Sequence, residues 1–268
     1  MDNNILFAFG LTLIAGLSTG IGSAIAFFAK KTNTKFLAIS LGFSAGVMIY
    51  VSMIEIFVKA RDSLVAELGL KAGSWATVAS FFGGMLLIAI IDKFVPNEEN
   101  PHHLHNVEEL NESKVHIEDN LMRTGMFTAL AVGIHNFPEG LATFISALQE
   151  PTIAIPITVA IAIHNIPEGI SISAPIYFAT GDRKKAFKYS FLSGLAEPIG
   201  ALVGYLILMP FLNDIVYGIV FGGVAGIMVY ISLDELLPSA QKYGEHHLSI
   251  GGLIAGMAVM AVSLLLFI

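Results

Sequence analysis

Long apolar segments separated by polar connections run through the whole chain. A helix needs about 20 apolar residues to cross a bilayer, and eight segments come close to that length. They lie at about 5–29, 36–58, 73–94, 124–148, 152–177, 186–209, 214–237 and 248–268. We therefore expect an all-α fold, a polytopic membrane protein whose eight transmembrane helices form one domain over residues 1–268.

One connection is much longer than the others, at about 95–123. It is polar and rich in His and Glu, a composition that cannot bury enough apolar surface to fold by itself. We interpret it as a flexible loop between the third and fourth spans.

The composition supports a chain surrounded by lipid. Apolar residues make up 55% and charged residues 13%, whereas soluble domains carry about 25% charged residues. The absence of Cys excludes disulfides and thiolate metal ligands. The basic patch and stacking aromatics needed for nucleic-acid binding are missing, so we expect no nucleic-acid partner.

Lys and Arg predict the orientation, because they favour cytoplasmic loops. If eight spans alternate in direction, only Lys59, Arg61 and Lys71 of the 14 Lys and Arg residues fall on the minority side. This places the chain in the cell membrane with both termini outside and the long loop in the cytoplasm.

The sequence contains internal repeats. HNFPEG at 135–140 matches HNIPEG at 164–169, and AGVMIYVSMIEIF at 45–57 matches AGIMVYISLDELL at 225–237. A weaker match pairs GLSTGIGS at 16–23 with GLAEPIGA at 194–201. Each match pairs spans that run in opposite directions, which predicts inverted repeats in a 3+2+3 arrangement. Inverted repeats are typical of secondary transporters, whose substrates bind near the bilayer midplane.

The two HNxPEG motifs place ionisable side chains in the middle of apolar spans. His135 and Glu139 are four residues apart and share one helix face, as do His164 and Glu168. An ionised group at this depth costs about 2.5–3.5 kcal/mol on insertion scales. A bound cation, protons or both would supply the compensating charge. The candidate ligands are the polar side chains of both motifs and the mid-span acid of the sixth span: His135, Asn136, Glu139, His164, Asn165, Glu168 and Glu197.

Imidazole nitrogen combined with carboxylate oxygen suits Zn²⁺ and other first-row divalent ions. A Mg²⁺ or Ca²⁺ site would instead be built from oxygen alone. Pro138 and Pro167 lack the N–H that would bond the carbonyls of Ile134 and Ile163, so those carbonyls can line a polar cavity.

Further acids lie nearer the span ends. Glu55 in the second span and its repeat partner Glu235 in the seventh, beside Asp234, suggest steps on an entrance and an exit path. Interfacial side chains are the simpler alternative for Asp234 and Glu235. Met48 could offer a thioether ligand, although Met in an apolar helix more often serves packing. Histidines of the long loop, which could bind metal or only be solvated, are His102, His103, His105 and His116.

These motifs resemble the ZIP (Zrt/Irt-like) family of metal transporters, in its bacterial ZupT/GufA-like branch, over nearly the whole chain. The resemblance implies metal uptake into the cytoplasm, with spans 1, 4, 5 and 6 moving against the rest. The cargo would be Zn²⁺ and also Fe²⁺, Mn²⁺, Co²⁺ or Cd²⁺, without any catalytic cofactor. Asn165 departs from the pattern, because some relatives carry Asp there.

The resemblance also implies a two-metal centre. The first ion would be held by His135, Glu139, His164 and Glu168. The second would be held by Asn136, Glu139, Asn165, Glu168 and Glu197, so that the two motif glutamates bridge both ions.

Two other functions compete with metal transport. A membrane-embedded zinc hydrolase could use His and Glu to activate water, but no span carries the HExxH motif of such enzymes. A proton-coupled carrier of an organic solute would need acids and histidines, yet has no use for near-identical ligand sets on two helices. The sequence leaves open whether the protein is a monomer or a homodimer.

Overall fold

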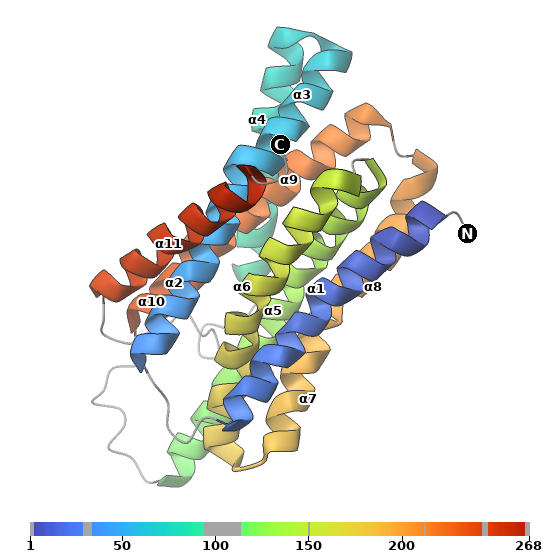
Figure 1. Ribbon diagram of the computed structural model, residues 1–268. Helices are drawn as coiled ribbons and strands as arrows, with labels where there is room; N and C mark the ends of the chain where they lie inside the picture. The colour runs from blue at the N-terminus through green and yellow to red at the C-terminus, as the bar shows by residue number, and fades with distance from the viewer. Residues whose placement is uncertain are drawn as a thin grey trace.

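The computed structural model describes residues 3–28, 34–93, 114–149, 151–211, 213–242 and 246–265. All regular elements in this part of the chain are helical (Figure 1). The α-helices are α1 (Asn3–Phe28), α2 (Thr34–Tyr50), α3 (Phe57–Leu68), α4 (Leu70–Lys93), α5 (Lys114–Gln149), α6 (Pro151–Thr180), α7 (Arg183–Gly194), α8 (Ala196–Val203), α9 (Asp214–Ile231), α10 (Leu237–Lys242) and α11 (His246–Leu265). Short π-helical segments η1 (Val51–Ile56), η3 (Gly204–Leu208) and η5 (Ser232–Leu236), and the 3₁₀ turn η4 (Met209–Phe211), extend α2, α8 and α9.

Seven helical segments of the described residues are long and apolar enough to cross a bilayer. They are Asn4–Ala24, Ala38–Leu68, Leu70–Lys93, Ala154–Ser173, Arg183–Leu208, Asp214–Gln241 and His246–Leu265. The protein is therefore a multi-pass helical membrane protein, as the apolar pattern predicts. The remaining predicted span, 124–148, lies within the continuous helix α5, and a total of eight spans stays a prediction.

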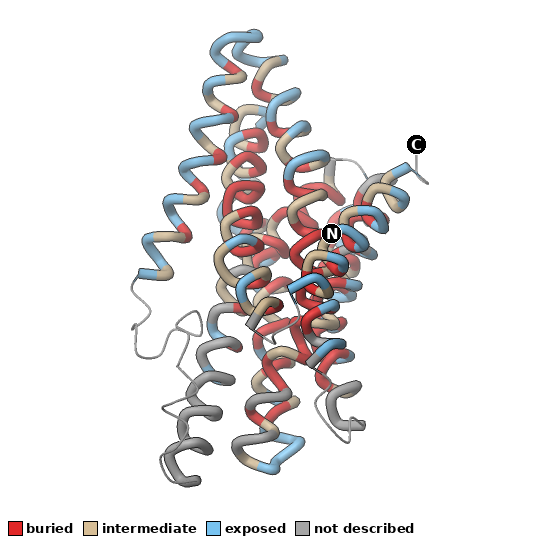
Figure 2. The backbone as a smooth tube through the Cα atoms, turned by 90° about the vertical axis from the view of Figure 1, so that its left-hand side faces the viewer, coloured by how far each residue is buried: buried red, intermediate tan, exposed pale blue. Residues whose placement is uncertain are grey.

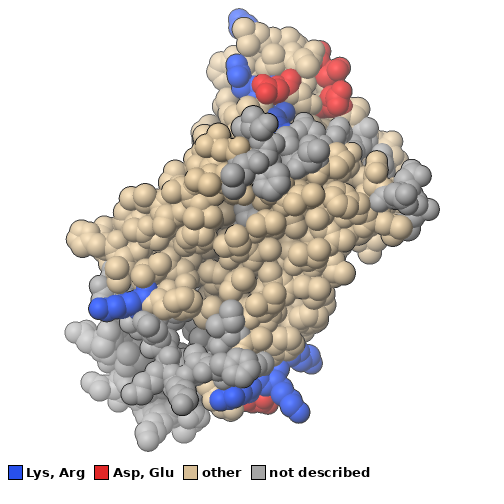
Figure 3. All heavy atoms as spheres, viewed as in Figure 1, with Lys and Arg blue, Asp and Glu red and all other residues tan. Residues whose placement is uncertain are grey.

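The molecular surface supports the same interpretation. Large apolar side chains such as Trp75, Phe82 and Leu206 are exposed along the helices. On the face shown in Figure 3, the charged side chains that are described gather toward the two ends of the molecule. An apolar belt between polar ends matches the profile of a bilayer.

The helices fall into two groups by their packing. α1, α5, α6, α7 and α8 pack against one another, and α2 packs against α11 while α4 packs against α9 and α3. Figure 2 shows buried residues concentrated along the inner sides of the central helices. The largest apolar cluster joins the two groups, since Met48 and Phe221 belong to it together with Phe144 of α5.

Glycine sets the distance between several of these helices. A Cβ added at Gly84 of α4 would lie 2.0 Å from the carbonyl oxygen of Gly223 on α9. Small residues are typical of such close helix crossings in membranes, where the helices gain packing rather than hydrophobic burial.

We predict that Gly84→Ala destabilises the protein, while Gly83→Ala leaves it unchanged. The second substitution is a matched control, because a Cβ at Gly83 meets no atom within 4 Å. Overpacking of this kind costs about 1–3 kcal/mol. Thermal unfolding of both variants in detergent measures the difference, and equal stability would contradict the close α4–α9 crossing.

The π-helical segments occupy corresponding places in one sequence repeat. η1 begins six residues after Ala45 and η5 begins seven residues after Ala225, and these two alanines open the matching motifs. π-helical turns interrupt the regular backbone ladder and frequently mark functional positions. Glu55 lies in η1, whereas Asp234 and Glu235 lie in η5.

The boundary of the long loop differs from the prediction of 95–123. Helix α5 begins at Lys114, so the last ten predicted loop residues are helical. The stretch from Lys114 to Thr124 contains neither Gly nor Pro, so nothing in it stops a helix from continuing beyond the apolar span. His102, His103 and His105 lie outside the described residues. His116 lies on α5, but its side chain lies outside the described set.

Candidate metal centre

The candidate centre lies where α5 and α6 pack against each other, with α1 and α8 beside them. Six of the seven predicted ligands are described with their side chains, and all six are completely buried: Asn136, Glu139, His164, Asn165, Glu168 and Glu197. His135 lies on α5 one turn before Glu139, and its side chain lies outside the described set. The tertiary structure thus buries a polar cluster among helices that are otherwise apolar.

The glycine that closes each motif lets its helix approach a neighbour closely. A Cβ at Gly140 would lie 2.0 Å from the carbonyl oxygen of Glu197 on α8. A Cβ at Gly169 would lie 2.0 Å from the carbonyl oxygen of Thr19 on α1. Thr19 and Glu197 are matching positions in the weaker sequence repeat, so the two motifs contact their neighbours in the same way.

Glycines of α1 and α8 contact the two motifs in the same pairing, α1 with α6 and α8 with α5. Cβ atoms at Gly22 and Gly200 would lie 2.0 and 2.1 Å from the carbonyl oxygens of Ile166 and Phe137. Both Ile166 and Phe137 are the third residue of an HNxPEG motif. These contacts fix α1 against α6 and α8 against α5 at matching depths.

Two backbone carbonyls orient the asparagines. Asn165 Nδ2 donates to the carbonyl oxygen of Ala15 at 3.0 Å, and Asn136 Nδ2 donates to that of Ser193 at 3.4 Å. Ala15 and Ser193 each precede the matched repeat segments by one residue. Because the amide nitrogens are used for these bonds, the Asn136 and Asn165 Oδ1 atoms remain as acceptors, and neither has a hydrogen-bond partner among the described residues. Sequence spacing gave no sign of either carbonyl.

The acids are also held in place from neighbouring helices. Glu139 Oε2 lies 3.2 Å from His164 Nε2, which joins the two motifs directly. Besides its bond to the Ala15 carbonyl, Asn165 Nδ2 donates a hydrogen bond to Glu197 Oε1. The other Glu139 oxygen has no hydrogen-bond partner in the described part of the chain. A buried acceptor without a partner costs about 1–3 kcal/mol, and a cation would remove that cost for several of these oxygens at once.

The described side chains lie close together, but they do not form a complete coordination shell. Among them, no three His, Asp or Glu groups converge in a metal-binding geometry. The available donors are imidazole nitrogen, carboxylate oxygen and amide oxygen, a set that suits first-row divalent ions.

Comparison with known proteins identifies the family. The sequence profile of the ZIP zinc transporters matches residues 92–264. The chain is 68% identical to the zinc transporter ZupT of Clostridium perfringens over 99% of this chain and 98% of that protein. It is 66% identical to ZupT of Lysinibacillus sphaericus and 65% identical to ZupT of Streptococcus mutans, in both cases over 100% of either chain.

The chain belongs to the ZIP zinc transporter family. This confirms the resemblance seen in the motifs. The ZIP protein is a transporter and not an enzyme, so the hydrolase alternative is set aside.

The predicted pathway residues of this ZIP protein lie in different environments. Met48 is completely buried in the main apolar cluster, which agrees with a packing role. Glu55 is partly exposed and forms an ion pair with Lys59, whose Nζ lies 3.4 Å from Glu55 Oε1. Asp234 and Glu235 are partly exposed. The pairing of Glu55 with Lys59 was not expected from the sequence, although their spacing of four residues on a helix permits it.

Little open space lies between Glu139 and η1. A small enclosed cavity of about 10 Å³ lies between Glu139, Val51 and Ile56 and is bounded by Ile161 and Phe221. This is room for about one water molecule at most, so the side chains around Glu139 are closely packed on this side.

We predict that Asn165→Asp lowers the stability of the metal-free ZIP protein. A carboxylate cannot donate to the Ala15 carbonyl, and it would face the Glu197 carboxylate at the position of the present hydrogen bond. Hydrogen bonds to charged groups contribute about 1.5–3 kcal/mol. Added Zn²⁺ should restore much of the loss, because it neutralises both acids.

Asn213→Asp is the matched control for this substitution. Asn213 Oδ1 accepts a hydrogen bond from Val216 N at the exposed start of α9, and an Asp caps a helix equally well. Thermal unfolding of both variants with and without Zn²⁺ measures the effect. A metal-free Asn165→Asp protein as stable as wild type would show that the Asn165 amide does not donate these bonds.

Proposed function

We propose that this chain carries Zn²⁺, and with it Fe²⁺, Mn²⁺, Co²⁺ and Cd²⁺, across the cell membrane into the cytoplasm. The observation that carries the proposal is the complete burial of three Glu, two Asn and one His side chain among apolar helices. Such groups are retained in a membrane interior only when function requires them. The names of the most similar relatives, all zinc transporters, point to the same cargo.

The proposed metal centre is built on α5, α6 and α8. The first ion is bound by His135, Glu139, His164 and Glu168, and the second by Asn136, Glu139, Asn165, Glu168 and Glu197. The 3.2 Å contact between Glu139 and His164 supports a shared ligand set, because it places donors of both motifs in one cluster. Neutral Asn oxygens lower the total charge of the second site, which favours release of the ion.

The proposed topology has eight spans in a 3+2+3 inverted repeat. The matched glycine contacts of α1 with α6 and of α8 with α5 support it, since equivalent positions of the repeats meet equivalent backbone atoms. Both termini lie outside, and the loop that precedes α5 lies in the cytoplasm. Spans 1, 4, 5 and 6 move against the others as one body.

The proposed path enters near Glu55 and leaves past Asp234 and Glu235. The partial exposure of all three acids supports this path, because an ion can reach a side chain only if other protein atoms do not cover it. Histidines of the cytoplasmic loop, His102, His103, His105 and His116, would receive the released ion.

Metal uptake into proteoliposomes tests the function. Purified protein should accumulate Zn²⁺ in the lumen and leave Mg²⁺ outside, and a chelator in the outer buffer should abolish the uptake. A protein that moves no divalent ion under these conditions would contradict the proposal. Retained uptake of an organic solute in the presence of chelator would favour the proton-coupled carrier instead.

A further inference from the structure

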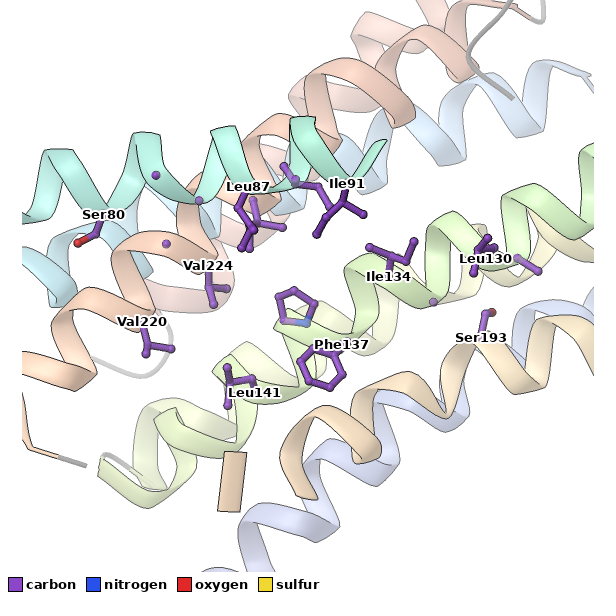
Figure 4. Close-up of a pocket in the computed structure, with 18 of the residues that line it drawn as sticks. Ser80, Leu87, Ile91, Leu130, Ile134, Phe137, Leu141, Ser193, Val220 and Val224 are labelled. Carbon is purple, nitrogen blue, oxygen red and sulfur yellow. The ribbon is translucent and has the colours of Figure 1, made fainter. Parts of the chain in front are cut away.

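A large apolar crevice lies between α4 and α9 on one side and α5 and α7 on the other. It encloses about 1110 Å³ and is lined by residues of α4, α5, α7 and α9 (Figure 4). Leu87 and Ile91 of α4 face Ile134 and Phe137 of α5 across it. Apart from the hydroxyls of Ser80, Tyr189 and Ser193, no polar side chain of the described residues lines the crevice.

Its position in the membrane determines what can fill it. The α4, α7 and α9 residues that line it belong to membrane-crossing segments, and the crevice is open at its side, where Leu87, Leu130 and Leu192 are exposed. Water gains few hydrogen bonds from such a lining. The surrounding hydrocarbon chains fit it without loss, so an acyl chain is the expected occupant.

Exposed cations lie beyond one end of the crevice. Figure 4 places Ile91, Leu130 and Ser193 toward one end and Ser80, Val220 and Leu141 toward the other. The first end leads to the start of α7, where the exposed cations are Arg183, Lys184, Lys185 and Lys188. Lys188 directly precedes Tyr189, which lines the crevice, and Lys185 lies one turn earlier.

The acids at this end leave the α7 side cationic. Asp182 accepts hydrogen bonds from the backbone nitrogens of Lys184 and Lys185 as the cap of α7. Asp92 lies on the other side, at the end of α4, and Asp234 and Glu235 lie there in η5, which follows α9. A phosphate group is therefore favoured over α7.

We propose that an anionic phospholipid occupies this crevice, with its acyl chains between α4 and α5 and its phosphate beside Lys185 and Lys188. The lipid fills the space between the two helix groups and binds with higher affinity than the lipids that surround the protein. None of the buried candidate ligands lines the crevice, so the lipid would not occupy the proposed metal centre itself.

Tryptophan fluorescence with brominated lipids tests the site. The chain has one Trp, the exposed Trp75, so Trp75→Phe gives a silent background. Leu87→Trp then reports on the crevice. Leu86→Trp, its neighbour on α4, is exposed outside the crevice and reports on the annulus. Both exposed positions tolerate Trp, and detergent gel filtration verifies each variant.

We expect brominated phosphatidylglycerol to quench the Leu87→Trp reporter with about tenfold higher relative affinity than brominated phosphatidylcholine. The two lysines attract a headgroup with a net negative charge, whereas the choline of phosphatidylcholine cancels the charge of its phosphate. The Leu86→Trp reporter should show no preference. Lys185→Gln with Lys188→Gln should abolish the preference, and Lys71→Gln, an exposed cation at the start of α4, should leave it intact.

Several results would overturn the proposal. Equal quenching of both reporters by both lipids would mean that ordinary annular lipid fills the crevice. Quenching of the Leu87→Trp reporter by acrylamide and not by lipid would mean that water fills it. Protection from all three quenchers would mean that protein, such as a second copy of this chain, covers it.

Discussion

Replacing Glu139 or Glu168 by Ala should abolish zinc uptake in proteoliposomes. Both side chains are completely buried, and Glu139 lies 3.2 Å from His164 of the other motif. Each Glu is proposed to bind both ions, so either substitution removes a ligand from two sites. Loss of an outer-shell partner alone weakens metal binding about 10–100-fold, and loss of a bridging ligand should exceed about 100-fold.

Glu139→Ala should lower the stability of the metal-free protein only moderately. It leaves the buried His164 Nε2 without this partner, which costs about 1–3 kcal/mol, but it also removes a buried carboxylate oxygen that lacks a hydrogen-bond partner within the described chain. Glu67→Ala, at an exposed position of α3, is the matched control and should transport normally. Wild-type uptake by both buried variants would refute the bridging role of these acids.

Gly140→Ala and Gly169→Ala should each cause loss of both stability and transport. The new methyl group would lie 2.0 Å from a carbonyl oxygen of α8 or α1, about half of a normal contact distance between carbon atoms. The helices must separate, which costs about 1–3 kcal/mol. In Gly140→Ala the separation also moves Glu197 away from Asn165. In Gly169→Ala it moves the Ala15 carbonyl away from Asn165. Both groups accept hydrogen bonds from the Asn165 side chain.

Gly133→Ala supplies the control on the same helix α5. A Cβ at Gly133 would be 3.9 Å from the nearest atom, the Cα of Ser193, which is an ordinary contact. Thermal unfolding in detergent and zinc uptake should both remain at the wild-type level in this variant. If Gly140→Ala behaved like Gly133→Ala, the close approach of α5 and α8 would be wrong.

Local patterns in the sequence determined the class of protein and the candidate ligands. Apolar segments of about 20 residues have few stable arrangements other than membrane-spanning helices. A spacing of four residues places His164 and Glu168 on one face of any α-helix, so the motif could be interpreted before its neighbours were known. The paired HNxPEG motifs were also specific enough to indicate the ZIP family.

Contacts between helices could be decided only by the tertiary structure. The bonds of Asn165 to Ala15 and Glu197 join residues far apart in the chain, and no local spacing encodes them. The burial of Met48 and the crevice beside Phe137 likewise depend on which helix lies opposite. Residue spacing fixes which side chains share a helix face, whereas the surfaces of neighbouring helices fix what each face meets.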